Sequence, residues 1–150
     1  MPSLFAFLHH LAAFAFVSAL AVEFVLIRHE LNARTARAIL VADAVGGASA
    51  GVVLVVGLLR VFFFEKGAAY YFHSIPFLAK ISLFVLIALL SIYPTVQFLS
   101  WRKDLKAGRA PAVSESARRK IRSILHLELA ALVLLILNAA LMARGIGYVG

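Results

Sequence analysis

The sequence places ionisable side chains inside four long apolar segments, at two matched depths. The outer group, near one end of the segments, comprises His9, His10, Arg60 and Lys80. The inner group, near the other end, comprises Glu23, Asp43, His126 and Glu128. A charged side chain at the centre of a membrane helix costs about 2.5 kcal/mol or more, so such residues are usually paired, hydrated or functional. The function therefore depends on which of them bind a ligand.

The outer group has the residue types of a cofactor site. Helical bundles build such sites from side chains on facing helices, and imidazole is a common ligand of haem iron. His9 and His10 point about 100° apart on a helix, so at most one of them faces the bundle centre. Lys80 and Arg60 have no carboxylate at their depth, because Glu65 falls in a loop. Unless they extend to the interface, we expect their charge to attract an anion.

His73 lies in the loop before the third segment, where we expect it to fold over the outer group. The inner group contains both acids and a base, with Arg28, His29 and Arg122 nearer the water. It is therefore predicted to be a polar network of interhelical ion pairs and hydrogen bonds. A proton path is the alternative function for these residues.

Composition predicts the elements that position these residues. The chain has 150 residues, is 63% hydrophobic and has no cysteine, which excludes disulfides, thiolate metal sites and thioether-linked haem. A helix needs about 20 apolar residues to cross a bilayer. We predict an all-α, four-transmembrane-helix bundle forming a single transmembrane domain, with spans at about 4–27, 38–64, 75–101 and 121–143. The first segment lacks a basic start and is longer than a signal-peptide core, so we expect it to be retained.

The net charge of +8 indicates membrane topology rather than nucleic-acid binding, for which no motif is present. Three Lys or Arg residues follow the first segment, eight lie between Arg102 and Arg122, and four lie elsewhere. The positive-inside rule then predicts that both termini face out and that the basic loop at 102–120 is cytoplasmic. That loop is expected to contact anionic lipid headgroups in a bacterial cytoplasmic (inner) membrane.

Gly47-x-x-x-Gly51 in the second segment has the spacing that lets membrane helices approach closely. It predicts helix packing within the bundle or a homo-oligomer through this face. Alternatively, the missing side chains make room for a flat cofactor.

Several motifs carry a resemblance to a known family. They read LHHLAAFAF, AVEFVLIR, GLLRVFFFEKGAAYYFH, FLAKISLFVLIALLSIYPTVQFLSWR and LNAALMARGIG. Together they resemble a bacterial predicted-membrane-protein family, domain of unknown function 2214, over nearly the whole chain. The resemblance implies a four-span inner-membrane protein and no particular activity.

A more distant resemblance is to HemJ-type protoporphyrinogen oxidases and CopD-like membrane proteins. Its features here are His10 or His9, the glycines from Gly47 to Gly57, Phe77-Leu78-Ala79-Lys80, and the basic loop Lys103–Gly108. In the oxidases, the first-span His and the third-span Lys are thought to serve the haem or porphyrin site. This resemblance implies that His10 and Lys80 lie at one pocket.

Three functions follow as hypotheses. The first is an inner-membrane protein that binds haem b, with a redox or porphyrin-related role and a quinone as electron partner. In it, His9 or His10 ligates iron. Lys80, the other histidine or His73 supplies the second ligand or binds a propionate, and Arg60 pairs with the other propionate. The second is a small non-enzymatic membrane subunit or assembly partner without a cofactor. The third, copper handling through His9, His10 and His73, has less support because Cu(I) prefers sulfur ligands.

Overall fold

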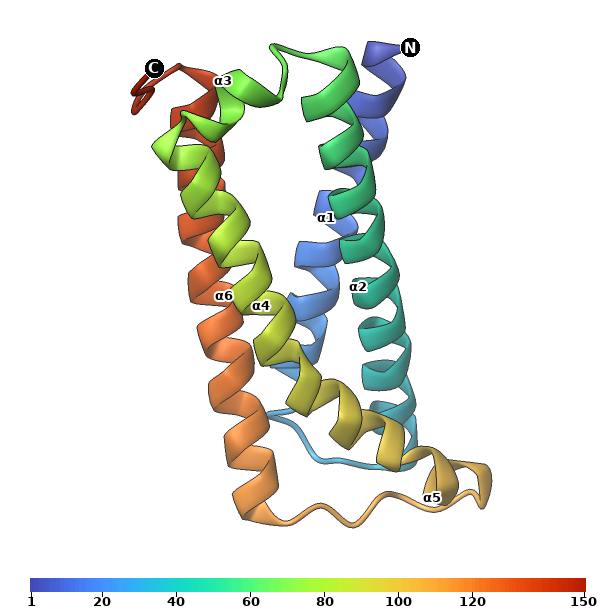
Figure 1. Ribbon diagram of the computed structural model, residues 1–150. Helices are drawn as coiled ribbons and strands as arrows, with labels where there is room; N and C mark the ends of the chain where they lie inside the picture. Colours follow the sequence, from blue (N-terminus) through green and yellow to red (C-terminus); the bar gives the residue numbers. More distant parts are fainter.

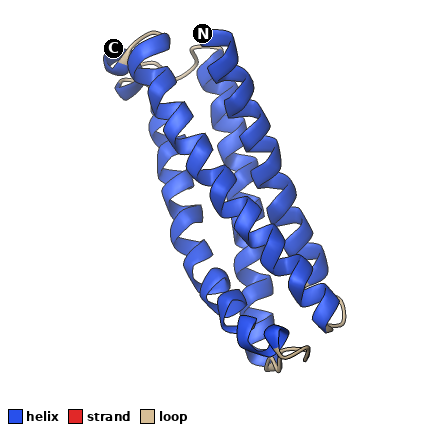
Figure 2. Ribbon diagram, turned by 90° about the vertical axis from the view of Figure 1, so that its right-hand side faces the viewer, coloured by secondary structure: helices blue, strands red, loops and turns tan.

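Four long helices dominate the computed structural model, which describes all residues from Met1 to Gly150 (Figure 1). They are α1 (Pro2–Leu26), α2 (Ala33–Leu59), α4 (Ile75–Ser100) and α6 (Glu115–Ala143). Two short helices, α3 (Ala68–Phe72) and α5 (Arg102–Lys106), lie in the connections. All four long helices are long and apolar enough to cross a membrane, and there is no β-strand (Figure 2). The predicted all-α fold with four spans is confirmed, whereas the N-out/C-out orientation stays a prediction.

Two helices begin earlier than the apolar pattern indicated, because polar residues cap them. Helix α2 starts at Ala33 rather than near residue 38, and the Asn32 side chain accepts a hydrogen bond from the Thr35 amide at 2.9 Å. Helix α6 starts at Glu115, where the Ser114 hydroxyl accepts from the Ala117 amide at 3.1 Å. The segment 102–120, predicted as a loop, therefore contains α5 and the start of α6.

The long helices form two hairpins. Helix α1 packs mainly against α2, and α4 packs mainly against α6, with fewer contacts between the pairs. The most deeply buried large side chains gather near α5, at the end that also holds the α1–α2 connection; they are Ile27, Ile39, Phe98, Ile121 and Leu125. Both termini and α3 lie at the opposite end (Figure 1). The bundle is thus tightly packed near α5, and the space between the hairpins lies further along.

Basic side chains secure the α5 end by binding helix carbonyls. Arg118 donates from Nε to the Ile27 carbonyl oxygen at 2.8 Å and from its guanidinium to the His29 carbonyl oxygen. Arg37 donates to the Leu105 carbonyl oxygen at 3.1 Å. These bonds satisfy acceptors left free at helix ends. Part of the basic charge at the first turns of α2 and α6 therefore has a structural role.

At the opposite end, the C-terminal tail pairs with the start of α4. The Ile75 amide donates to the Gly147 carbonyl oxygen at 3.0 Å, and the Val149 amide donates to the His73 carbonyl oxygen at 2.9 Å. Gly147 has a φ of +84°, and a Cβ there would lie 2.7 Å from Pro76 Cδ. Only glycine combines this backbone with so close an approach.

Close packing of α1 on α2 depends on Gly46. A Cβ added there would lie 3.2 Å from the Cβ of Ala19, whereas one added at Gly47 or Gly51 would have nothing within 4 Å. The Gly47-x-x-x-Gly51 pair therefore does not mediate helix packing inside this chain.

We expect Gly46→Val to destabilise the protein and Gly51→Val, the matched control, to have a much smaller effect. Overpacking of a close contact costs about 1–3 kcal/mol. The measurement is the thermal unfolding midpoint of each variant in detergent. Equal losses in both variants would contradict this account of the α1–α2 contact.

Candidate functional site

Two cavities lie between the hairpins. The acidic cavity has a volume of about 480 Å³ and is lined by Glu23, Asp43 and Glu128, together with mostly small and apolar residues. The basic cavity, of about 470 Å³, is lined by His9, His10, Lys80 and mainly apolar side chains. Three residues line both cavities, namely Phe16, Leu54 and Phe84. The ring centroids of Phe16 and Phe84 are 6.4 Å apart, so these side chains separate the two spaces.

His9, rather than His10, is the histidine that faces inward. Its Nδ1 is buried and has no hydrogen-bond partner. Its ring lies against Gly57, where a Cβ would be 3.2 Å from His9 Cε1. His10 is exposed at the cavity edge, with Nδ1 2.6 Å from the Ala6 carbonyl oxygen. Glycine at position 57 thus makes the space that the His9 ring occupies.

Lys80 faces the basic cavity without an anion. It forms no ion pair, and its Nζ lies 5.7 Å from the centroid of the Phe77 ring. The cavity therefore combines an unpartnered imidazole nitrogen and a cation with largely apolar walls.

Arg60 forms an ion pair, contrary to the prediction that no carboxylate lies at its depth. Its guanidinium pairs with Glu65, which also accepts a hydrogen bond from the Tyr71 hydroxyl. A π-helical turn over Arg60–Phe64, followed by Gly67 with a φ of +88°, folds the connection so that Glu65 reaches back to the helix end. Arg60 therefore has a carboxylate at its own depth.

Two groups in this connection have shifted pKa values. Partial burial acts to raise the pKa of Glu65, but the Tyr71 hydrogen bond and the Arg60 charge outweigh it, and the pKa lies below its usual value. Burial and the same hydrogen bond raise the pKa of the Tyr71 hydroxyl well above its usual range. At neutral pH Glu65 is thus an ionised partner of Arg60.

His73 lies apart from the basic cavity. Its side chain is exposed, and Nδ1 lies 2.7 Å from the Ala69 carbonyl oxygen. The prediction that it folds over the outer group is therefore wrong. No three His, Asp or Glu side chains converge on a point that could hold a metal ion. The geometry thus gives no copper site at His9, His10 and His73.

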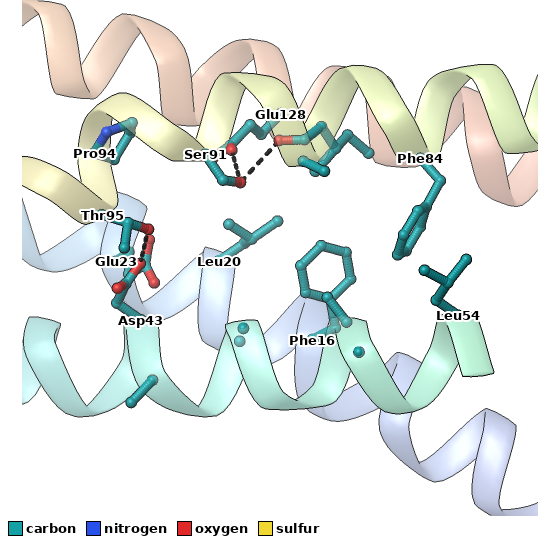
Figure 3. A pocket seen from close by; sticks show the side chains of 17 residues that line it. Phe16, Leu20, Glu23, Asp43, Leu54, Phe84, Ser91, Pro94, Thr95 and Glu128 are labelled. Atoms are coloured by element: carbon teal, nitrogen blue, oxygen red, sulfur yellow. Dashed lines mark hydrogen bonds between the residues drawn. The ribbon is translucent and has the colours of Figure 1, made fainter. Parts of the chain in front are cut away.

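The acidic cavity brings three carboxyl groups together (Figure 3). Glu23 and Glu128 are only 3% and 1% exposed, and Asp43 is half-buried. Thr95 Oγ1 donates to Asp43 Oδ1 at 2.8 Å, and the Ser91 hydroxyl is hydrogen-bonded to Glu128 Oε1. Glu128 Oε2 is buried without a hydrogen-bond partner.

Of the interhelical ion pairs and hydrogen bonds predicted for the inner group, the hydrogen bonds are present at Asp43 and Glu128, but the ion pairs are not. The two ion pairs of the protein, Arg60–Glu65 and Arg109–Asp104, both lie in the connections. His126 is exposed and its ring packs 6.0 Å from that of Phe24, with no contribution to the cavity lining. Positions 126 and 128 share a depth, but two helical steps turn them about 200° apart.

The nearby arginines also point elsewhere. The Arg28 guanidinium lies 4.1 Å from the centroid of the Phe24 ring, and Arg122 is exposed. His29 is exposed as well. The three carboxyl groups therefore share one cavity that no cation lines.

Sequence reasoning missed the two hydroxyls, Ser91 and Thr95, that bind the carboxyl groups. It also missed a spacing that would have distinguished the histidines. His9, Phe16 and Glu23 follow one another at intervals of seven residues. A seven-residue step drifts only about 20° around a helix, so these three share one face of α1. His10 lies outside this series.

We expect Glu65→Gln to lower the thermal unfolding midpoint at neutral pH. A carboxyl whose pKa is depressed on folding adds stability above its unfolded pKa, and loses it as the pH falls through the folded value. The difference from the wild type should therefore shrink on acidification. Asp104→Asn removes the longer and more exposed ion pair, of 3.4 Å, and should have the smaller effect. A pH-independent loss in Glu65→Gln would contradict the assignment.

Comparison with known proteins identifies the family. The model of the family described as "Predicted membrane protein (DUF2214)" matches residues 1–147. No curated protein and no solved structure matches the chain. The match covers all four long helices and both cavities. The chain therefore belongs to the DUF2214 family of predicted membrane proteins, and it is a multi-pass integral membrane protein.

Proposed function

We propose that this membrane protein binds haem b in the basic cavity and has a redox or porphyrin-related role. The observation that carries the proposal is the buried, unpartnered Nδ1 of His9, which shares an apolar cavity with Lys80. It is unfavourable to shield from water an imidazole nitrogen that has no hydrogen-bond partner or a cation that has no anion. Both groups therefore favour the binding of a ligand. An apolar molecule with a metal centre and carboxylate groups supplies both.

The residues present fit this group. His9 would provide the imidazole ligand, and Lys80 would pair with a propionate. Gly57 makes room for the His9 ring itself, which a larger side chain at this position would displace. Arg60 and His73 drop out of the proposed ligand set, because Arg60 pairs with Glu65 and His73 lies outside the cavity. Haem bound here would supply one-electron redox chemistry.

Quinones and other porphyrins remain candidate partners of the same cavity. Quinone oxygens accept hydrogen bonds from an imidazole N–H and an ammonium group, which His9 and Lys80 can donate. With both termini outside a bacterial inner membrane, the cavity would lie in the outer half of the bilayer. That location suits exchange of an apolar ligand from the lipid.

We expect protein purified from haem-replete cells to be red, with a Soret band that His9→Ala abolishes. His10→Ala is the matched control and should keep the band, because His10 is exposed and bonded within its own helix. Lys80→Met should weaken haem retention, because it removes the cation and keeps the apolar stem. Absorbance spectra and haem content per protein measure all three effects.

A colourless wild-type preparation would overturn the haem proposal. A band lost in His10→Ala but kept in His9→Ala would overturn the assignment of the ligand. Bound quinone, extracted from the same preparation and lost in both His9→Ala and Lys80→Met, would replace haem as the ligand.

A non-enzymatic membrane subunit is the second candidate function. Gly47 and Gly51 are exposed, and added Cβ atoms there would touch nothing. This small-residue face of α2 lines the acidic cavity without touching another helix of the chain, and such faces commonly pack against a helix in membranes. In this candidate, the partner is a second copy or another membrane protein.

Under this alternative, we expect the wild-type chain to self-associate in lipid and Gly51→Leu to reduce the association. Leucine would hold the backbones apart at a small-residue contact. Val45→Leu, on the exposed far side of the same helix, is the control and should leave the association unchanged. Single-molecule photobleaching in vesicles counts the chains. A monomeric wild type removes the homo-oligomer from consideration.

A further inference from the structure

The acidic cavity holds more carboxyl groups than its surroundings can balance. Glu23 comes from α1, Asp43 from α2 and Glu128 from α6, while α4 contributes only the hydroxyls of Ser91 and Thr95. No Lys, Arg or His lines the cavity. Several ionised carboxylates sharing a buried site repel one another and lack water to solvate them. The cluster therefore requires a bound cation or bound protons.

An unsatisfied atom aims into this space. Glu128 is 1% exposed, and its Oε2 is buried without any hydrogen-bond partner. Glu23 is 3% exposed and lines the same cavity. Leaving a buried polar atom unpaired is costly, so Glu128 points to something that binds in the cavity.

The two contacts of Ser91 can accommodate a proton on Glu128. The Ser91 Oγ lies 2.8 Å from the Ile87 carbonyl oxygen and also contacts Glu128 Oε1. A hydroxyl has one hydrogen, and a carbonyl oxygen can only accept. If Ser91 donates to Ile87, the second contact requires Glu128 to donate to Ser91. A protonated Glu128 carboxyl satisfies both contacts at once.

A metal ion fits the cavity less well. No three of its carboxyl groups converge closely enough to hold one ion. Protons need no such convergence, because each carboxyl group binds its own. We propose that the acidic cavity is a proton-binding site, in which Glu23, Asp43 and Glu128 hold exchangeable protons within the membrane.

The position of the site couples its protonation to the arrangement of the hairpins. Glu23 and Asp43 belong to the α1–α2 hairpin, and Glu128 to the α4–α6 hairpin. The bond from Thr95 to Asp43 crosses between the hairpins at the cavity. Loss of protons places like charges on both hairpins, which favours their separation.

Infrared spectroscopy of the full chain in lipid vesicles tests the proposal directly. At about pH 7, where an ordinary carboxyl group is ionised, the wild type should show the carbonyl band of protonated carboxylic acids. The band should shift in D2O and disappear at high pH. Glu128→Gln and Glu23→Gln should each remove part of it. Glu30→Gln, an exposed residue after α1, is the control and should leave it unchanged.

Three results would overturn the proposal. They are the absence of the band in the wild type, its persistence at full strength in both cavity variants, and its appearance only after sodium and divalent cations are removed. The last result would show a bound metal cation in place of protons. Because the measurement requires neither haem nor His9, its outcome is independent of the function proposed for the basic cavity.

Discussion

The close approach of α1 to α2 at two glycines is the contact on which the rest of the structure depends. The side chain of Ala19 packs against Gly46, with Glu23 beside it, and the ring of His9 packs against Gly57. The two glycines are eleven residues apart, which is close to three helical turns, so they lie on one face of α2. By bringing α1 this close, they hold His9 and Glu23 at the edge of the space between the hairpins. A bulkier α2 would push both side chains toward lipid.

The space between the hairpins is important because a bilayer contains no water to hydrogen-bond polar side chains that lack a partner in the protein. A soluble protein can leave a lysine or glutamate at its surface, whereas a buried polar group in a membrane must find a partner or bind one. Arg60 meets this requirement within the chain through Glu65, as Arg118 does through the carbonyls at the end of α1. His9 Nδ1, Lys80 and Glu128 Oε2 do not. The residues that lack a hydrogen-bond or ion-pair partner within the chain are therefore the ones that indicate ligand binding.

The sequence predicted well how far along its helix each polar residue lies. It did not predict which face of the helix the residue is on. Apolar run length was enough for the four helices, and the caps Asn32 and Ser114 only moved their starts. Depth alone suggested that His126 would balance Glu128, but helical rotation places them on different faces. Glu65 was assigned to the loop, and a π-helical turn, which has no clear sequence signal, returns it to Arg60. The seven-residue spacing of His9 and Glu23 was the directional signal that the sequence did contain.

The two cavities carry opposite kinds of side chain, and their separation keeps both kinds available. Lys80 and Ser91, the partner of Glu128, are eleven residues apart on α4, or about 16 Å, so the cavity carboxyl groups lie beyond the reach of the lysine. Phe16 lies seven residues from both His9 and Glu23, so the helical repeat that places the base and the acid on one face also places an aromatic ring between them. With Leu54 and Phe84 it closes the apolar partition. The separation thus preserves an unpaired base on one side and unpaired acids on the other, which is the arrangement expected of two binding sites rather than of a structural ion pair.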